Sequence, residues 1–137
     1  SATVGRSIIG AGDEIRGEVT GSVLGSGVVV GEGAIIRDSI IMKDTYIGKG
    51  TYIEKSIIAE NCKIGENCKI GVGEYAESKL NPKVYAFDLV TIGSDSEIPD
   101  NVEIGKNTAI HGVTADADYQ NGRLESGCYI VKEGESA

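Results

Sequence analysis

One histidine, three cysteines and a recurring serine are the side chains of this sequence that could carry out chemistry. An imidazole can act as a general base in acyl transfer, and His111 is the one residue that could serve. It stands where the last repeat gives way to a polar tail, so we interpret it as a solvated or capping residue. A catalytic zinc site of the carbonic anhydrase kind needs about three histidine ligands. A sequence with one histidine excludes it.

The cysteine spacing raises the question of a metal or redox pair, because Cys62 and Cys68 lie six residues apart. Their place in the repeat argues against both. Thr45 and Thr51 occupy the same two places 17 residues earlier, and these places take small residues throughout. We therefore predict that both cysteines are buried packing residues on different faces of the fold, and we expect the same of Cys128.

Serines recur at nearly constant spacing, as Ser7, Ser22, Ser39 and Ser56. A serine nucleophile needs an adjacent base, and no histidine or aspartate is placed to activate each copy. We interpret the series as corner residues that satisfy backbone groups. Most lysines and arginines alternate with acidic residues and face solvent in this interpretation. Lys79 and Lys83 lie outside the repeats and are better candidates for an anion or interface contact.

An internal repeat of 17 residues organises the first half of the chain. Aliphatic residues recur at this spacing in three series: Leu24, Ile41 and Ile58; Val30, Ile47 and Ile64; and Val19, Ile36, Ile53 and Ile70. Each coil divides into six, six and five residues, each led by an aliphatic residue. The fifth place of the six-residue units is small or β-branched: Val28, Ala34, Thr45, Thr51, Cys62 and Cys68. This pattern predicts a three-sided prism with a narrow interior.

The predicted fold is therefore an all-β, single-stranded parallel β-helix of the hexapeptide-repeat type, with about five coils. A core of 18 Ile and 12 Val, with one Phe and no Trp, fits such stacked flat sheets. The hexads are interrupted at residues 72–91, which we predict to be a projecting loop. The expected layout is one domain over residues 1–137, with coils at 4–71 and 90–113, an inserted loop at 72–89 and a capping tail at 114–137.

Charge and composition exclude several classes of partner. The net charge of −8 argues against nucleic acid and anionic membranes, which need a basic surface. No stretch is long enough to span a bilayer, and no secretory signal is visible. Three cysteines without a paired framework suit a reducing compartment, so we expect a cytoplasmic protein. The chain begins with Ser-Ala-Thr instead of Met, which we interpret as a processed piece or an expressed fragment.

Two motifs carry a resemblance to a known family. The first is the serine side of each coil, Ser-Ile-Ile at residues 39–41 and 56–58, with hexads such as Tyr-Ile-Gly-Lys-Gly at 46–50. The second is Val-Thr-Ile-Gly at 90–93 leading into Glu-Ile-Pro-Asp-Asn-Val-Glu-Ile-Gly-Lys-Asn at 97–107. Together with the interruption at 72–91, they resemble the C-terminal domain of bacterial glucose-1-phosphate adenylyltransferase, also called ADP-glucose pyrophosphorylase.

This resemblance implies a left-handed β-helix that follows a Rossmann-like nucleotidyltransferase domain. That domain joins ATP and glucose 1-phosphate to give ADP-glucose and pyrophosphate, with Mg²⁺, for glycogen synthesis. The present chain would contain no catalytic, cofactor or metal site, while its parent protein would be an enzyme. The chain would contact its own N-terminal catalytic domain, contribute to a homo-oligomer (a tetramer by resemblance), and form part of a site for a small anionic effector.

One position departs from the family pattern. Some relatives carry a lysine two residues after the position of Ile92, where it contacts the phosphate of an activator. Ser94 stands there in this sequence, followed by Asp95. The resemblance thus leaves open a regulatory or inactive subunit. Two alternatives also stay open: a stand-alone hexapeptide-repeat acyltransferase, and the β-helix domain of another sugar nucleotidyltransferase, such as a mannose-1-phosphate guanylyltransferase.

Overall fold

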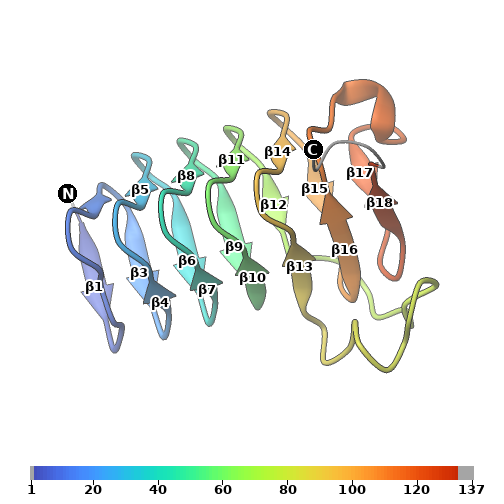
Figure 1. Cartoon of the computed structure of the whole chain (residues 1–137), viewed down its shortest axis with the longest axis horizontal. Coiled ribbons are helices and arrows are strands. Elements are labelled where there is room, and N and C mark those ends of the chain that lie inside the picture. Colours follow the sequence, from blue (N-terminus) through green and yellow to red (C-terminus); the bar gives the residue numbers. More distant parts are fainter. Residues whose placement is uncertain (1, 133–137) are drawn as a thin grey trace.

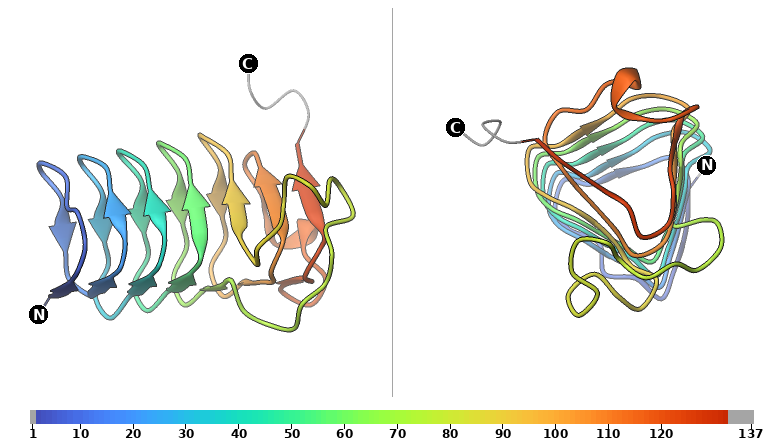
Figure 2. Two further views of the ribbon diagram at one scale, coloured as in Figure 1. Left: turned by 90° about the horizontal axis from the view of Figure 1, so that it is seen from below. Right: turned by 90° about the vertical axis from the view of Figure 1, so that its right-hand side faces the viewer.

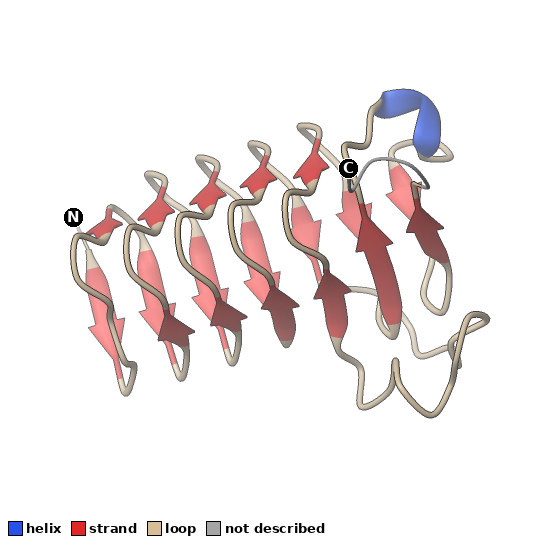
Figure 3. Cartoon of the chain, in the orientation of Figure 1, coloured by secondary structure: helices blue, strands red, loops and turns tan. Residues whose placement is uncertain are grey.

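The computed structural model describes residues 2–132, which wind into a three-sided parallel β-helix (Figures 1 and 2). Nearly all regular structure is strand, apart from the 3-10 helix η1 (Asp116–Asp118), as Figure 3 shows. Every named strand pairs with parallel neighbours one coil away, as the repeat predicts. The part of the chain that the structure describes contains no helix with the length and hydropathy of a membrane span.

Three sheets form the faces of the prism. Face A has seven strands: β1 (Thr3–Gly5), β3 (Glu18–Thr20), β6 (Ile35–Arg37), β9 (Tyr52–Glu54), β12 (Lys69–Ile70), β15 (Glu103–Ile104) and β17 (Arg123–Leu124). Face B has six: β4 (Val23–Leu24), β7 (Ile40–Ile41), β10 (Ser56–Ile58), β13 (Val90–Ile92), β16 (Thr108–His111) and β18 (Tyr129–Val131). Face C has five: β2 (Glu14–Ile15), β5 (Val29–Val30), β8 (Tyr46–Ile47), β11 (Lys63–Ile64) and β14 (Glu97–Ile98).

The observed register confirms the 17-residue repeat. On face B, Leu24 pairs with Ile41 and Ile41 with Ile58. The other two series pair in the same way on faces C and A. The first coil is shorter, because Val4 pairs with Val19 at a spacing of 15. The prism is longer than the predicted five or so coils, because strands near both ends of the chain, β1 and β17, extend face A to seven strands.

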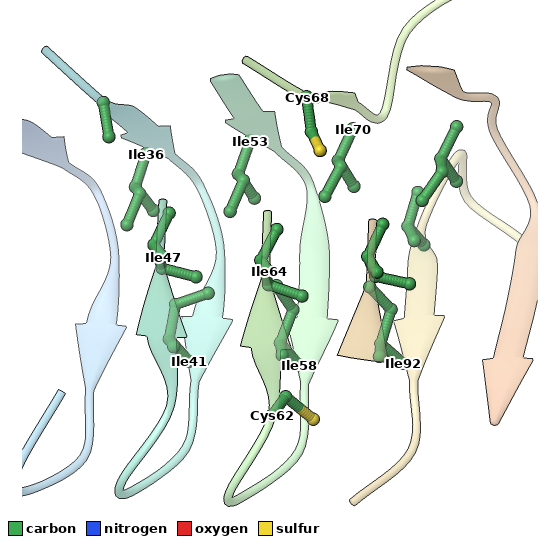
Figure 4. Close-up of a cluster of buried hydrophobic side chains, with 14 of the residues drawn as sticks. Ile36, Ile41, Ile47, Ile53, Ile58, Cys62, Ile64, Cys68, Ile70 and Ile92 are labelled. Atoms are coloured by element: carbon green, nitrogen blue, oxygen red, sulfur yellow. The ribbon is translucent and has the colours of Figure 1, made fainter. Parts of the chain in front are cut away.

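The interior of the prism is a column of like side chains (Figure 4). The residue that leads each face points inward and is fully buried, as for Ile41, Ile47 and Ile53 at 0% exposure. The small places beside them are also buried, and Cys62 and Cys68 fill two of these on different faces, as predicted. Burial of each leading aliphatic side chain contributes roughly 1.5–3 kcal/mol.

The corners need tight backbone turns, and two residue types supply them. Asp and Asn side chains tolerate the left-handed backbone region, and Asp44 and Asn61 adopt it one coil apart with φ of 59°. Glycine instead allows close approach between coils. A Cβ at Gly48 would lie 2.3 Å from the carbonyl oxygen of Gly65, so no larger residue fits there. This explains why glycine so often follows the leading aliphatic residue.

Residues 71–89 leave the helix at the corner between faces A and B, the A–B corner, as a projecting loop without strands (Figure 2). The strands of the β-helix resume with β13, which starts at Val90, the residue at which the expected second run of coils begins. Val90 pairs with Ser56 and so takes the place of the next serine in the series. Beyond β16, the tail adds a last coil to this end of the prism, with β17 on face A and β18 on face B (Figure 1), and we call this part of the chain the cap.

Candidate functional site

The inserted loop is held at both of its ends by one buried amide. The Oδ1 atom of Asn107 accepts a hydrogen bond from the backbone N–H of Asp88 at 2.8 Å, and its Nδ2 atom donates to the carbonyl of Ala76 at 2.9 Å. Asn107 is only 1% exposed. Because a buried amide without partners is costly, these two bonds fix the loop relative to the coil that carries Asn107.

The middle of the loop sits on the last turn of the chain. Ser78 is buried, and its Oγ atom accepts hydrogen bonds from the N–H groups of Leu80 and Asn81 at 3.1 and 3.2 Å. The N–H of Lys79 donates to the carbonyl of Gly127 at 2.7 Å. Gly127 has φ of 80°, and a Cβ there would lie 2.3 Å from the carbonyl oxygen of Glu77. The loop is therefore an ordered platform fitted to the capped end.

Lys79 lines a groove of about 740 Å³ between this platform and the cap. Two basic residues, Lys79 and Arg123, and two acidic ones, Asp118 and Glu125, share the lining. The side chain of Asp118 is also tied to Lys132 at 2.9 Å. The groove can thus offer charged groups of both signs to a polar ligand or to a protein surface.

Lys83 and Ser94, the other two candidate effector contacts, lie apart from this groove. Lys83 is exposed on the loop, where its N–H donates to Oδ1 of Asn81 at 3.1 Å. Ser94 is half-buried just after β13, at the corner between faces B and C (the B–C corner). The loop enters face B at the A–B corner and Ser94 leaves it at the B–C corner, so within one chain the three residues do not line one pocket.

The loop also presents apolar side chains to solvent. Phe87 is 86% exposed, and Tyr75 and Val84 are 68% and 62% exposed. Phe87 has φ of 60°, a strained conformation for a bulky residue. Strain of this kind persists only where the surrounding structure enforces it. An ordered loop that exposes large apolar groups is typical of a contact surface for another protein surface.

The tail that caps the prism is built around Tyr119. Its hydroxyl lies 2.9 Å from Oγ1 of Thr114, which donates to the carbonyl of Glu97 at 2.6 Å. Burial raises the pKa of Tyr119 to about 12. A tight turn is present at Asn121 and Gly122, both with positive φ, between the bridged residues Gln120 and Arg123.

The repeated serines are structural, as predicted. Ser39 Oγ donates to the carbonyl of Arg37 at 2.8 Å and accepts from the N–H of Ser56 at 3.0 Å. Ser22 makes the same pair of bonds with the carbonyl of Thr20 and the N–H of Ser39. The hydroxyls of Ser7, Ser22 and Ser39 thus join one coil to the next at the A–B corner, whereas that of Ser56 donates to the carbonyl of Glu54 in its own coil.

The cysteines and the histidine also have packing roles. Burial raises the pKa of the Cys62 and Cys68 thiols, so both are protonated and unreactive at neutral pH. Cys128 is half-buried beside the same core. The half-buried ring of His111 packs on Gly93, where a Cβ would lie 2.4 Å from the ring. Among residues 2–132, no three His, Cys, Asp or Glu side chains come close enough together to hold a metal ion.

Sequence reasoning missed two features. Asn107 looks like the other corner residues, such as Asn101, and nothing in the sequence marks it as the anchor of the loop. The outward aliphatic residues of face B were also missed. Their signal is a doublet such as Ile40–Ile41 or Ile57–Ile58, because one residue of each pair must face outward in a strand.

Comparison with known proteins agrees with the hexapeptide repeat and with the family that its motifs resemble. A family model described as GlmU-like, C-terminal hexapeptide matches residues 1–84. A glucose-1-phosphate adenylyltransferase from Lachnospira eligens is 65% identical over 135 residues, which are 98% of this chain and 32% of the relative. One from Thermotoga neapolitana is 52% identical over 134 residues, again 98% of this chain and 32% of the relative. The chain thus spans about a third of the length of these relatives, and the resemblance seen in its motifs is confirmed.

The solved structures show the fold alone. The acetyltransferase domain of PglB from Neisseria gonorrhoeae FA1090 aligns with a TM-score of 0.54 at 18% identity, covering 97% of this chain and 52% of that chain. Its complex with acetyl coenzyme A aligns with a TM-score of 0.53 at 19% identity, covering 96% and 51%. The parallel β-helix is of the left-handed type that the family resemblance implies. By its repeat, its fold and the match over more than half of its residues, this chain belongs to the GlmU-like C-terminal hexapeptide family.

Proposed function

We propose that this chain is the C-terminal domain of a cytoplasmic glucose-1-phosphate adenylyltransferase, and that it serves assembly and regulation. The parent enzyme would make ADP-glucose and pyrophosphate from ATP and glucose 1-phosphate for glycogen synthesis. The catalytic domain that precedes this one would bind ATP and Mg²⁺. In this proposal the β-helix contacts that domain, joins subunits into a homo-oligomer, and forms part of a site for a small anionic effector.

The observation that carries the proposal is the extent of the similarity. It covers 98% of this chain in the adenylyltransferase from Lachnospira eligens, so it includes the inserted loop and the capping tail as well as the hexads. Hexads occur in many proteins, but an insertion at one corner and a particular cap are individual features. The inserted loop also presents an ordered surface with exposed apolar side chains, which suits a supporting domain.

The effector part of the proposal rests on Lys79, Lys83 and the loop that carries them. A rigid platform that bears basic side chains can hold an anion by charge-assisted hydrogen bonds. Ser94 supplies no positive charge, so a phosphate contact in this proposal comes from the loop. The charged groove beside Lys79 is where such a ligand would meet a neighbouring domain.

A chimera tests the proposed function. The present 137 residues would replace the matching third of the Lachnospira eligens enzyme, and pyrophosphate release from ATP and glucose 1-phosphate would be measured. We expect the chimera to keep the activity of the parent and to assemble with the same number of subunits. A truncated enzyme without this third should fail to reach that number of subunits. An inactive, misassembled chimera, or a truncated enzyme that is unchanged in both respects, would contradict the proposal.

Substrate controls separate the alternatives. The chimera tests whether this domain supports an adenylyltransferase. The alternative that its parent is a mannose-1-phosphate guanylyltransferase is tested by assaying the natural full-length protein with GTP and mannose 1-phosphate. An acetyl coenzyme A titration of this chain tests the acyltransferase alternative, for which we expect no binding. Saturable binding of acetyl coenzyme A between β-helices would instead favour acyl transfer.

A further inference from the structure

The outward side of face B carries an uninterrupted apolar row. Ile8 is bridged to Val23, Val23 pairs with Ile40, and Ile40 pairs with Ile57, one coil apart each time. We call these four residues the face-B ladder. Ile8, Val23 and Ile40 are 67%, 41% and 43% exposed, and Ile57 is half-buried. Met42, 41% exposed, extends the apolar surface beside Ile40.

The corresponding outward rows of the other two faces are mixed in character. On face A the row runs through Glu18, Ile35, Tyr52, Lys69 and Glu103. On face C it runs through Glu14, Val29, Tyr46, Lys63 and Glu97. Charged side chains interrupt both rows, as expected for surfaces in water. Face B is therefore the side on which four consecutive coils keep charge away, which marks a surface that another surface covers.

Charged residues flank the ladder in a regular order. At the A–B corner, Asp38 stands beside Ile40 and Lys55 beside Ile57. At the B–C corner the signs are reversed: Lys43 follows the coil of Ile40, and Glu60 follows the coil of Ile57. All four side chains are exposed. Lys43 and Glu60 lie 4.0 Å apart with more than half of each side chain exposed, so both remain available to a further partner.

We infer that face B packs against face B of a second copy of this chain, about a two-fold axis parallel to the axis of the prism. Such an axis places the A–B corner of each copy opposite the B–C corner of the other, coil by coil. Asp38 then meets Lys43 of the second copy, and Lys55 meets its Glu60. Every pair has opposite charge, and the two ladders pack on each other between them.

The ladder and the charge order together select this axis over its perpendicular rivals. A two-fold axis perpendicular to the prism through Ile40 would place Asp38 opposite Asp38 and Lys43 opposite Lys43, and like charges across an interface are unfavourable. A perpendicular axis midway between the coils of Ile40 and Ile57 would pair opposite charges, but it would place Val23 opposite Thr91 and Ile8 opposite Ala109, outside the ladder. The parallel axis pairs opposite charges in two successive coils and packs every ladder residue on the ladder of the second copy. In a closed two-fold contact each pair occurs twice, so both opposite-charge pairs are present twice in the dimer.

The same axis explains why the candidate effector contacts are separate within one chain. The loop with Lys79 and Lys83 projects from the A–B corner of the coil that contains β13, and Ser94 occupies the B–C corner of that coil. In the proposed pair, the loop corner of one copy faces the Ser94 corner of the other. A site that uses these residues together would then form only in the pair, which deepens the assembly and regulation role proposed above and rests on it.

Sedimentation equilibrium of the 137-residue chain tests the inference. We expect the mass to rise with concentration from 14.3 kDa toward twice that value. Ile40→Lys should weaken the association about tenfold or more. Tyr46→Lys, in the same coil but on face C and equally exposed at 45%, should change it less than about twofold. Circular dichroism melting curves would show that both variants remain folded.

A charge exchange tests the axis. Asp38→Lys and Lys43→Asp should each weaken the association severalfold, and the double variant should restore it, because only the parallel axis pairs these two positions. Lysine fits the corner conformation of Asp38, since Lys55 adopts it one coil later with φ of 47°.

Three results would overturn the inference. They are a monomeric chain at all concentrations up to about 1 mM, an equal loss from Ile40→Lys and Tyr46→Lys, or a double variant no better than the single ones. A monomeric chain whose chimera is active would refute this contact and leave the proposed function standing, with the preceding domain as the occupant of face B. An associating chain whose chimera is inactive would refute the proposed function alone.

Discussion

The hydroxyl of Ser39 accepts a hydrogen bond from the backbone N–H of Ser56, one coil further along, at 3.0 Å. Both residues are buried, so this N–H has no access to water. Within the strands the coils are joined by backbone bonds, but at this corner the side chain of one coil completes the backbone of the next. The stability of the A–B corner therefore depends on residue type, as it also does where Thr45 and Thr51 accept hydrogen bonds from the N–H groups of Cys62 and Cys68 at the other corners.

Replacing Ser39 with Ala should destabilise the protein by about 1–3 kcal/mol, because it leaves the buried N–H of Ser56 unpaired. The free energy of unfolding from urea denaturation measures this. Ser26→Ala is the matched control, since Ser26 is exposed at the B–C corner, and it should change the stability by less than about 0.5 kcal/mol. Equal losses of stability in the two variants would contradict the role of the Ser39 hydroxyl in joining successive coils.

Ile47→Asn should unfold the middle coils. Ile47 is 0% exposed between Val30 and Ile64, so the variant loses a buried aliphatic side chain and places an unpaired amide in the core. We expect a loss of roughly 3–5 kcal/mol. Lys49→Asn, two residues away at an exposed corner, should be nearly silent. Thermal melting followed by circular dichroism compares them, and similar midpoints would contradict the register.

Asn107→Ala should release the inserted loop while the prism stays folded. The variant loses both hydrogen bonds that hold Ala76 and Asp88. Trypsin can cut after Lys79 and Lys83, so the rate of cleavage at these sites should rise about tenfold or more as local opening becomes easier.

The control for this variant is Asn101→Ala. Asn101 is exposed and has φ of 61°, close to the 56° of Asn107, so both substitutions carry the same backbone strain. Of these two asparagines, only Asn107 forms side-chain hydrogen bonds to the loop. Equal acceleration of cleavage in both variants would mean that backbone strain at the corner, and not the loss of the two hydrogen bonds of Asn107, governs access to the loop.

Whether a feature of this structure could be predicted depends on whether it is determined within the repeat or by a distant segment of the chain. The inward positions, such as Ile41 and Cys62, follow from the repeat, because each coil offers its neighbour the same environment. Asn107 could not be told from Asn101, since its burial comes from a loop that passes over it from a distant part of the chain. Val90 breaks the serine pattern, but the aliphatic residues that follow it keep the register and mark where the coils resume.

The functional surface was predicted less well for a related reason. The basic residues of the loop could be singled out because they lie outside the repeats, but the groove beside Lys79 depends on how the tail folds back. The face-B ladder depends on which member of each aliphatic doublet faces outward. The repeat already sets this choice, because an inward Ile41 makes Ile40 face outward, but the apolar row is recognised only when the outward residues of successive coils are compared.

Tyr119→Phe should make the stability less sensitive to alkaline pH. Burial raises the pKa of Tyr119 to about 12 in the folded chain, above the value of about 10 for an exposed tyrosine. The folded state therefore holds its proton more tightly, so this contribution is fully present below about pH 10 and is lost as pH rises toward about 12. Phenylalanine has no proton to lose, so the variant should show a shallower fall over this window.

Urea denaturation at several pH values between about 9 and 12 measures the effect. At neutral pH the variant should already be less stable by about 1 kcal/mol, because the bond between the Tyr119 hydroxyl and Thr114 is lost. Subtracting the two stability curves removes the contribution of Cys62 and Cys68, whose buried thiols also have raised pKa values. Tyr75→Phe is the control, since this tyrosine is 68% exposed on the loop. If Tyr75→Phe altered the alkaline slope as much as Tyr119→Phe, burial under the cap would not be the cause.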